Sequence, residues 1–162
     1  MRQHLMWASA TLALVIAACG SSSPATSSKS PASSCANPGA PHHAYVVVEH
    51  LSGTSLQKCV GFAGDTIDGQ TLMDQSGIAY QAQTFSYGKA VCQIDNEPAQ
   101  YATCFPKNQP YWSLFVETAG AWTSAATAYT EAKLHDKEAL GWHYIQLSTA
   151  SPSPPPLAQQ QP

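Results

Sequence analysis

Charged residues are scarce in this sequence, at 10% of its 162 residues, against about 25% in a typical globular protein. The region from Cys35 to Leu147 holds five lysines and all ten acidic residues, a formal net charge of −5. The lysines are spread out and form no basic cluster. Binding to nucleic acid, or to anionic lipid through charge alone, is therefore not expected. Few charges with many Ser, Thr, Gln and Ala residues are typical of extracytoplasmic proteins.

Catalytic and metal-binding motifs are missing as well. There is no Gly-x-Ser-x-Gly elbow, no Gly-rich phosphate loop and no His-Glu-x-x-His helix, which argues against an enzyme. No Cys-x-x-Cys pair occurs, and the later cysteines are spaced by 24, 33 and 12 residues, unlike zinc ligands. We therefore predict no catalytic residues, no metal site and no resident cofactor. A zinc site built from these cysteines is the alternative.

Only one long apolar run is present, the 14 residues Leu5–Ala18. A membrane-spanning helix needs about 20 apolar residues, whereas this length suits the core of a signal peptide. The run ends in Ile16–Cys19, the order of one aliphatic residue, two small residues and Cys that lipoprotein-processing enzymes require. We predict a signal peptide over 1–18 and a lipid anchor on Cys19, with diacylglycerol and acyl chains such as palmitate. An ordinary secretory signal, with Cys19 incidental, is the alternative.

Two segments are too polar to fold on their own. Residues 19–34 contain almost only Ser, Ala, Thr, Pro and Gly, so they predict a flexible tether behind the lipid. Residues 148–162 carry a run of prolines, which predicts a disordered, extended tail. One foldable domain remains between them, over 35–147.

Four cysteines lie in that domain, an even number that indicates two disulfides in an oxidising compartment. Three pairings are open. Cys92 and Cys104 are close in sequence and flank a turn-rich segment, so we pair them, which leaves Cys35 with Cys59. Each loop closure would stabilise the fold by about 3 kcal/mol.

The hydrophobic pattern predicts an α+β domain, in which one short helix packs across a mixed sheet. Asp68 is a suitable N-cap and Gly77 a suitable left-handed C-cap for the helix between them. Residues 125–140 are ambiguous and favour an irregular strand and a loop. Strands are expected over Ala44–Leu51, Leu56–Phe62, Ile78–Phe85, Ala90–Ile94, Tyr111–Glu117 and Gly141–Leu147.

Five pieces stand in order along the domain: VVVEH, KCVGF, a helix opened by Asp-Gly, AVCQIDNEP and YWSLFV, with GWHY closing. This ordered set resembles the bacterial domain similar to the carboxy-terminal domain of transcobalamin and intrinsic factor. The resemblance covers roughly residues 44–145. It implies a β-grasp-like fold, which is often used to bind soluble ligands. The domain also resembles the half of the animal proteins that contacts cobalamin. The turn at His135–Glu138 departs from the acidic Gly-Asp turn of the relatives, so no ligand contact is carried over from there.

Aromatic residues in the last third of the chain are the candidate ligand contacts, since flat rings stack on planar ligands. The candidates are Tyr111, Trp112 and Trp122, and Trp122 is expected to be the most exposed because it follows a loop-like Ala-Gly-Ala. Core packing is the competing role for Trp112. Glu117 is expected to face solvent.

These observations favour a lipid-anchored module on the extracytoplasmic side of the cell membrane. We expect it to bind a small soluble ligand, such as a corrinoid or another cofactor, for delivery to an envelope transporter. The alternative is an envelope module for protein interaction or scaffolding, without a small ligand.

The lipid anchor is directly testable. We expect Cys19→Ser to abolish lipidation and to move the protein out of the membrane fraction, because the acylated thiol is lost. Mass spectrometry of the mature amino terminus measures both the cleavage site and the lipid. A variant that stays membrane-bound with its cleavage elsewhere would contradict the lipoprotein interpretation.

Overall fold

The computed structural model describes residues 35–147 and 151–160. The expected signal peptide, Cys19 and the tether over 19–34 lie outside the described residues. Within the described part of the chain, no helix is long and apolar enough to cross a membrane.

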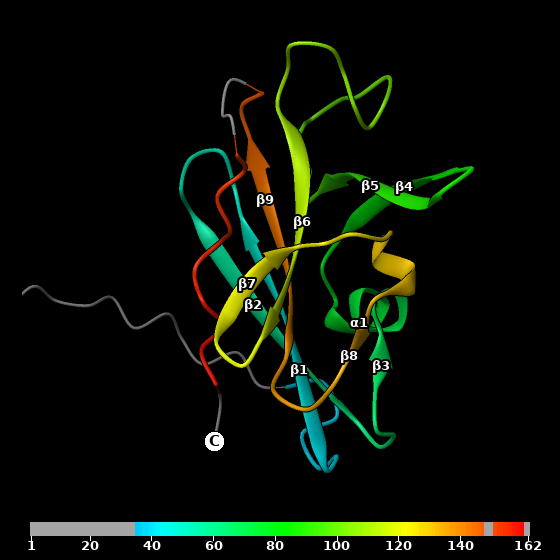
Figure 1. Ribbon diagram of the computed structural model, residues 1–162, viewed down its shortest axis with the longest axis vertical. Helices are drawn as coiled ribbons and strands as arrows, with labels where there is room; N and C mark the ends of the chain where they lie inside the picture. The colour runs from blue at the N-terminus through cyan, green and yellow to red at the C-terminus, as the bar shows by residue number, and fades with distance from the viewer. Residues whose placement is uncertain (1–34, 148–150, 161–162) are drawn as a thin grey trace, which may run out of the picture. The chain divides into compact units, whose positions relative to one another are not determined.

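The main sheet has five strands in the order β2-β1-β9-β6-β7 (Figure 1). Its strands are β1 (His42–Glu49), β2 (Ser55–Phe62), β6 (Tyr111–Thr118), β7 (Ala121–Ser124) and β9 (Ala139–Ile145). The central strands β1 and β9 run parallel, whereas all other neighbours pair antiparallel. The expected mixed sheet is thus confirmed.

Smaller elements cover one face of this sheet. The helix α1 (Gly69–Ser76) is accompanied by the 3-10 turn η1 (Tyr129–Glu131). Two short sheets complete the layer, formed by β3 (Ile67–Asp68) with β8 (Lys133–Leu134) and by β4 (Tyr80–Phe85) with β5 (Gly88–Ile94). One helix packed on a mixed sheet, as in β-grasp folds, is the α+β architecture that the sequence predicts.

The helix begins and ends where its capping residues predict. An Asp68 side-chain oxygen accepts the backbone N–H of Thr71 at 2.9 Å, and Gly77 adopts a left-handed φ of 72°. Leu72 and Met73 are fully buried and pack into the core. Because eight residues form a marginal helix in water, this packing on the sheet stabilises it.

Alternation along the central strands divides the core between the two faces of the sheet. The face toward α1 presents Val46 and Val48 from β1, whereas Tyr45 and Val47 lie in a separate cluster on the other face. All four side chains are buried. Both faces of β1 therefore require a cover.

Two disulfides join Cys35 to Cys59 and Cys92 to Cys104, the pairs expected from the sequence. The first ties the start of the described chain to β2, and the second ties β5 to the loop before β6. All four thiols are consumed, so none of these cysteines is left to ligate zinc.

The expectations for three segments need correction. Residues 121–124, where no strand was expected, form β7, which pairs with β6. Residues 125–140, expected as an irregular strand and a loop, contain η1, the two-residue strand β8 and the start of β9. Within the expected disordered tail, Ser151–Gln160 is extended but lies against the main sheet, with Pro155 and Ala158 buried. Hydrophobic periodicity does not predict segments as short as these, because tertiary contacts determine their conformation.

The Asp68 cap has a measurable effect on stability. Its pKa lies below the ordinary 3.8, chiefly because the carboxylate accepts the Thr71 backbone N–H. We expect Asp68→Ala to lower the free energy of unfolding by about 1 kcal/mol. Since the folded-state pKa is depressed, the stabilisation is present above the unfolded pKa and is lost as pH falls through the folded value. Urea unfolding of the wild type and of Asp68→Ala, at pH values from about 7 down to about 2, measures the difference.

Asp65→Ala is the matched control for this substitution, since Asp65 is exposed in the neighbouring loop. It should leave stability nearly unchanged at every pH. Equal effects of the two substitutions would rule out the capping role.

Removing the second disulfide should also cost stability. We expect Cys92→Ser/Cys104→Ser to lower the free energy of unfolding by about 3 kcal/mol, because the cross-link restricts the unfolded chain. Urea unfolding of the oxidised wild type and of the variant measures this, and unreduced peptide mapping checks the pairing. Free thiols in the oxidised wild-type domain would contradict it.

Candidate functional site

A groove of about 510 Å³ lies where the β4–β5 hairpin stands next to β6. It exists because β7 pairs only with Phe115–Thr118 and leaves the preceding half of β6 uncovered. Lys89, Ala90 and Val91 of β5 form one wall, and Tyr111–Leu114 of β6 forms the other. Residues 125–128 cross one end, where Ala128 approaches Gly88 so closely that a Cβ there would lie 2.6 Å from its methyl carbon.

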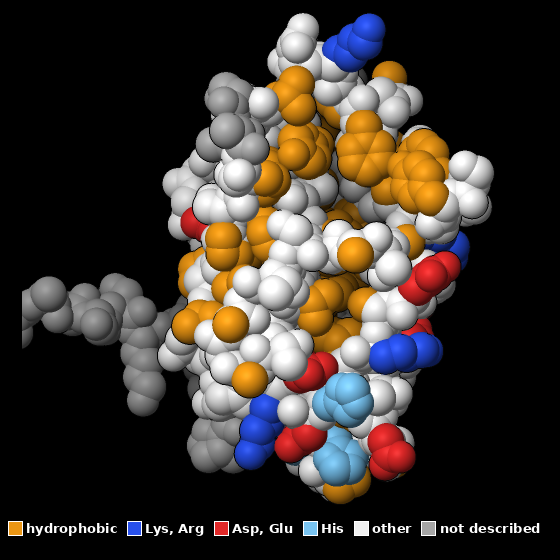
Figure 2. Space-filling view, viewed as in Figure 1, with side chains coloured by type: hydrophobic (Ala, Val, Ile, Leu, Met, Phe, Trp, Pro, Cys, Tyr) orange, Lys and Arg blue, Asp and Glu red, His pale blue; other side chains and the backbone are white. Residues whose placement is uncertain are grey.

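Aromatic rings form a continuous series at the mouth of the groove. Phe85 stacks on Tyr87 with ring centroids 5.2 Å apart and planes 7° apart. Phe105 links this pair to Tyr111, at 6.0 Å from Phe85 and 6.4 Å from Tyr111. Tyr87 is 58% exposed and Phe105 48%. Figure 2 shows hydrophobic side chains gathered on this face, whereas charged and histidine side chains gather at its far end.

The floor of the groove consists of buried aromatic side chains that are fixed by hydrogen bonds. Trp112 donates its indole N–H to the Glu97 carbonyl at 2.9 Å, and Trp142 donates to the Met73 sulfur at 3.3 Å. Burial raises the pKa of Tyr129, which keeps its phenol neutral. The two indole rings of the floor are thus hydrogen-bonded in place, whereas the rings at the mouth are exposed.

Polar groups are few among the residues that line the groove. Lys89 is the one charged side chain in that set, and its ammonium group donates to Gln70 at 3.1 Å. Ser113, Ser124 and Thr127 add hydroxyl groups. An apolar cleft with a few polar groups is the usual form of a small-molecule site, and this one is weakly cationic.

The three residues predicted as ligand contacts separate in the structure. Tyr111 and Trp112 both line the groove, although Trp112 is only 3% exposed and offers no face for stacking. The expectation that Trp122 is exposed is wrong. Trp122 lies on the opposite face of the sheet, with its ring over Gly141 and its indole N–H buried. As part of β7 it points to the face that strand alternation dictates.

The sequence reasoning missed Tyr87 and Phe105, the two most exposed rings of the groove. Both lie in segments that looked like connections, Tyr87 in the β4–β5 turn and Phe105 beside Cys104. Large aromatic residues in turns are a usable signal, because such rings have no core to enter from there.

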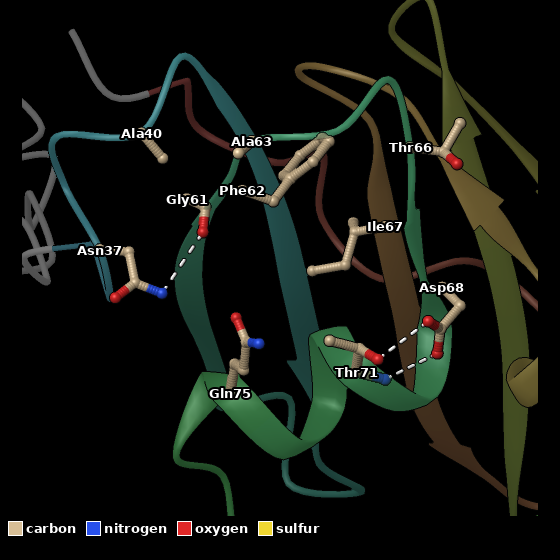
Figure 3. Close-up of a pocket in the computed structure, with 10 residues that line it drawn as sticks. All are labelled: Asn37, Ala40, Gly61, Phe62, Ala63, Thr66, Ile67, Asp68, Thr71 and Gln75. Atoms are coloured by element: carbon tan, nitrogen blue, oxygen red, sulfur yellow. Dashed lines mark hydrogen bonds between the residues drawn. The ribbon is translucent and has the colours of Figure 1, made fainter.

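A second hollow, of about 420 Å³, lies between the end of β2 and α1 (Figure 3). Its polar groups are largely used within the protein. Both Asp68 carboxylate oxygens accept from Thr71, and the Asn37 side chain donates to the Gly61 carbonyl at 3.5 Å. These polar side chains are therefore already engaged within the protein, and the aromatic groove is the better candidate. Among the described residues, no three His, Cys, Asp or Glu side chains are grouped to hold a metal ion.

Comparison with known proteins gives little further guidance. No protein-family model matches the chain, and no curated protein matches it. Among solved structures, it is similar to the crystal structure of a provisionally named metal binding protein from Ruminococcus gnavus, at 16% identity and a TM-score of 0.48, covering 65% of this chain and 97% of that one. None of these comparisons identifies the transcobalamin-type family, so that resemblance stays a prediction from the sequence.

Proposed function

We propose that this chain is a lipid-anchored, extracytoplasmic module that binds a small soluble ligand in the groove between β5 and β6. The aromatic series at the mouth of that groove carries the proposal. Monomeric proteins rarely keep large rings exposed in a contiguous set unless the surface binds something. A groove volume of about 510 Å³ also falls within the range usual for ligand sites.

The lining of the groove favours a flat ligand that carries a negative charge. Tyr87 and Phe105 line the groove, and Phe85 stacks on Tyr87 behind it; the two lining rings present faces and edges on which a planar group can stack. The ammonium group of Lys89 is the complementary charge. Corrinoids, haems and flavin nucleotides combine such a framework with acidic groups, and they are the ligand classes that we propose to test.

The proposed location follows from the signal-like start of the chain and from the disulfides. Two disulfides are expected in an oxidising compartment and rare in the cytosol. A lipid on Cys19 would keep the groove near the membrane surface. There the module would hand its ligand to an envelope transporter.

Fluorescence titration of the full chain with cobalamin, haemin and flavin nucleotides tests the ligand proposal. Trp112 and Trp142 lie in the floor of the groove, so binding should change their emission in a saturable manner. We expect a micromolar dissociation constant, about −8 kcal/mol. Phe105→Ala and Tyr111→Ala should each weaken binding roughly fivefold, since one ring contact contributes about 1 kcal/mol.

Leu51→Ala is the matched control, because Leu51 is 43% exposed and lies outside the groove. It should leave affinity unchanged. Lys89→Met should weaken the binding of negatively charged ligands only. If no ligand alters the emission, and the intact chain instead captures an envelope protein through the same rings, the interaction module is the better function.

A further inference from the structure

The carboxy-terminal segment Ser151–Gln160 crosses the face of the main sheet opposite α1. It is the red segment beside β9 and β2 in Figure 1, and hydrogen bonds join it to β2, β6 and β9. The His143 ring on β9 hydrogen-bonds the Ser153 carbonyl at 2.7 Å. Further along, Glu117 on β6 and Gln57 on β2 bind the segment near its end.

The sheet recognises the backbone of this segment. The Gln57 amide nitrogen donates to the Gln159 carbonyl at 2.7 Å, while the Gln159 N–H donates to the Gln57 amide oxygen at 2.7 Å. The Glu117 carboxylate accepts the Ala158 N–H at 2.9 Å. These contacts require an extended chain and are largely independent of side-chain identity, as in strand-like peptide recognition.

Small and cyclic side chains of the segment fill the apolar part of this face. Ala158 packs with Tyr45 and Val47. Pro155 and the Trp122 ring both lie over Gly141, where an added Cβ would be 2.9 Å from the proline and 2.6 Å from the indole. Gly141 therefore provides the space in which proline meets tryptophan, a pairing that extended proline-rich segments commonly use.

Glu117 shows that this face is built for a bound backbone. Expected to face solvent, it is only 4% exposed. A buried carboxylate is costly unless it accepts hydrogen bonds, and the N–H that it accepts belongs to Ala158 of the segment. The segment therefore both covers the Glu117 carboxylate and supplies a hydrogen-bond donor to it.

We infer that this face is a binding surface for an extended, proline-containing peptide segment, and that its intermolecular partner is the segment 151–160 of a second copy of this chain. The sheet residues that bind the segment all lie within 35–147, and the segment that occupies this face follows them in the same chain. A second copy would therefore offer the same contacts, which is the condition for segment exchange. The covalent link favours the intramolecular arrangement through its high effective concentration. Exchange of the segment between two chains should be detectable once its intramolecular binding is disrupted.

Two complementary full-length variants test the inference. Ala158→Arg places a long side chain in the apolar cluster, which should release the segment and leave the sheet face opposite α1 uncovered. Gln57→Ala/Glu117→Leu removes the hydrogen bonds that the sheet face makes to the backbone of Ala158 and Gln159, which should release an otherwise intact segment. Native mass spectrometry should find each variant monomeric alone. An equimolar mixture should give a 1:1 heterodimer, because the Gln57→Ala/Glu117→Leu chain supplies an intact segment and the Ala158→Arg chain supplies an intact sheet face.

Leu157→Arg is the matched control, since Leu157 is 47% exposed and adjoins Ala158. It should keep its own segment bound and form at least about tenfold less heterodimer with the Gln57→Ala/Glu117→Leu chain. Near-UV circular dichroism checks that every chain is folded. If Ala158→Arg does not fold, Gln159→Pro replaces it, because it removes the N–H donated to Gln57. A mixture of folded variants that stays monomeric overturns the inference.

Discussion

The parallel pair of β1 and β9 at the centre of the main sheet imposes the constraint on which the rest of the structure depends. Parallel strands are stable when both of their faces are covered, and β1 is apolar on both. Val46 and Val48 face one side, and Tyr45 and Val47 face the other. A small domain with one helix has only enough regular structure to cover the first side.

The two covers differ in kind, and each leaves a functional surface. On the first side, α1 and the β4–β5 hairpin cover most of the sheet, but half of β6 is left without a neighbouring strand. The aromatic groove lies at this unpaired half of β6. On the second side, an irregular proline-rich segment covers the sheet, held mainly by main-chain contacts to Gln57 and Glu117. This cover therefore depends mainly on hydrogen bonds to the backbone of the segment, whereas α1 is held by the packing of its side chains.

The candidate site was partly predictable. Tyr111 and Trp112 are found in the groove because they lie on the clearest strand of the sequence. Trp122 was misplaced, since β7 pairs over only four residues and such a strand has almost no periodic signal. Tyr87 and Phe105 come together through the second disulfide and the β4–β5 turn. Their proximity depends on long-range folding, which local patterns do not describe.

By itself, the sequence determined the α+β class, the long strands and the limits of the helix, and it favoured the cysteine pairs that the structure contains. Each follows from local chemistry, such as the Asp68 cap, the Gly77 left-handed turn and the short spacing of Cys92 and Cys104. Only the tertiary structure decided the burial of Glu117, the face of Trp122 and the course of Ser151–Gln160. Polar and proline-rich residues look unstructured in isolation, because the free energy that orders them comes from a sheet face more than a hundred residues away in places, as between Gln57 and Gln159.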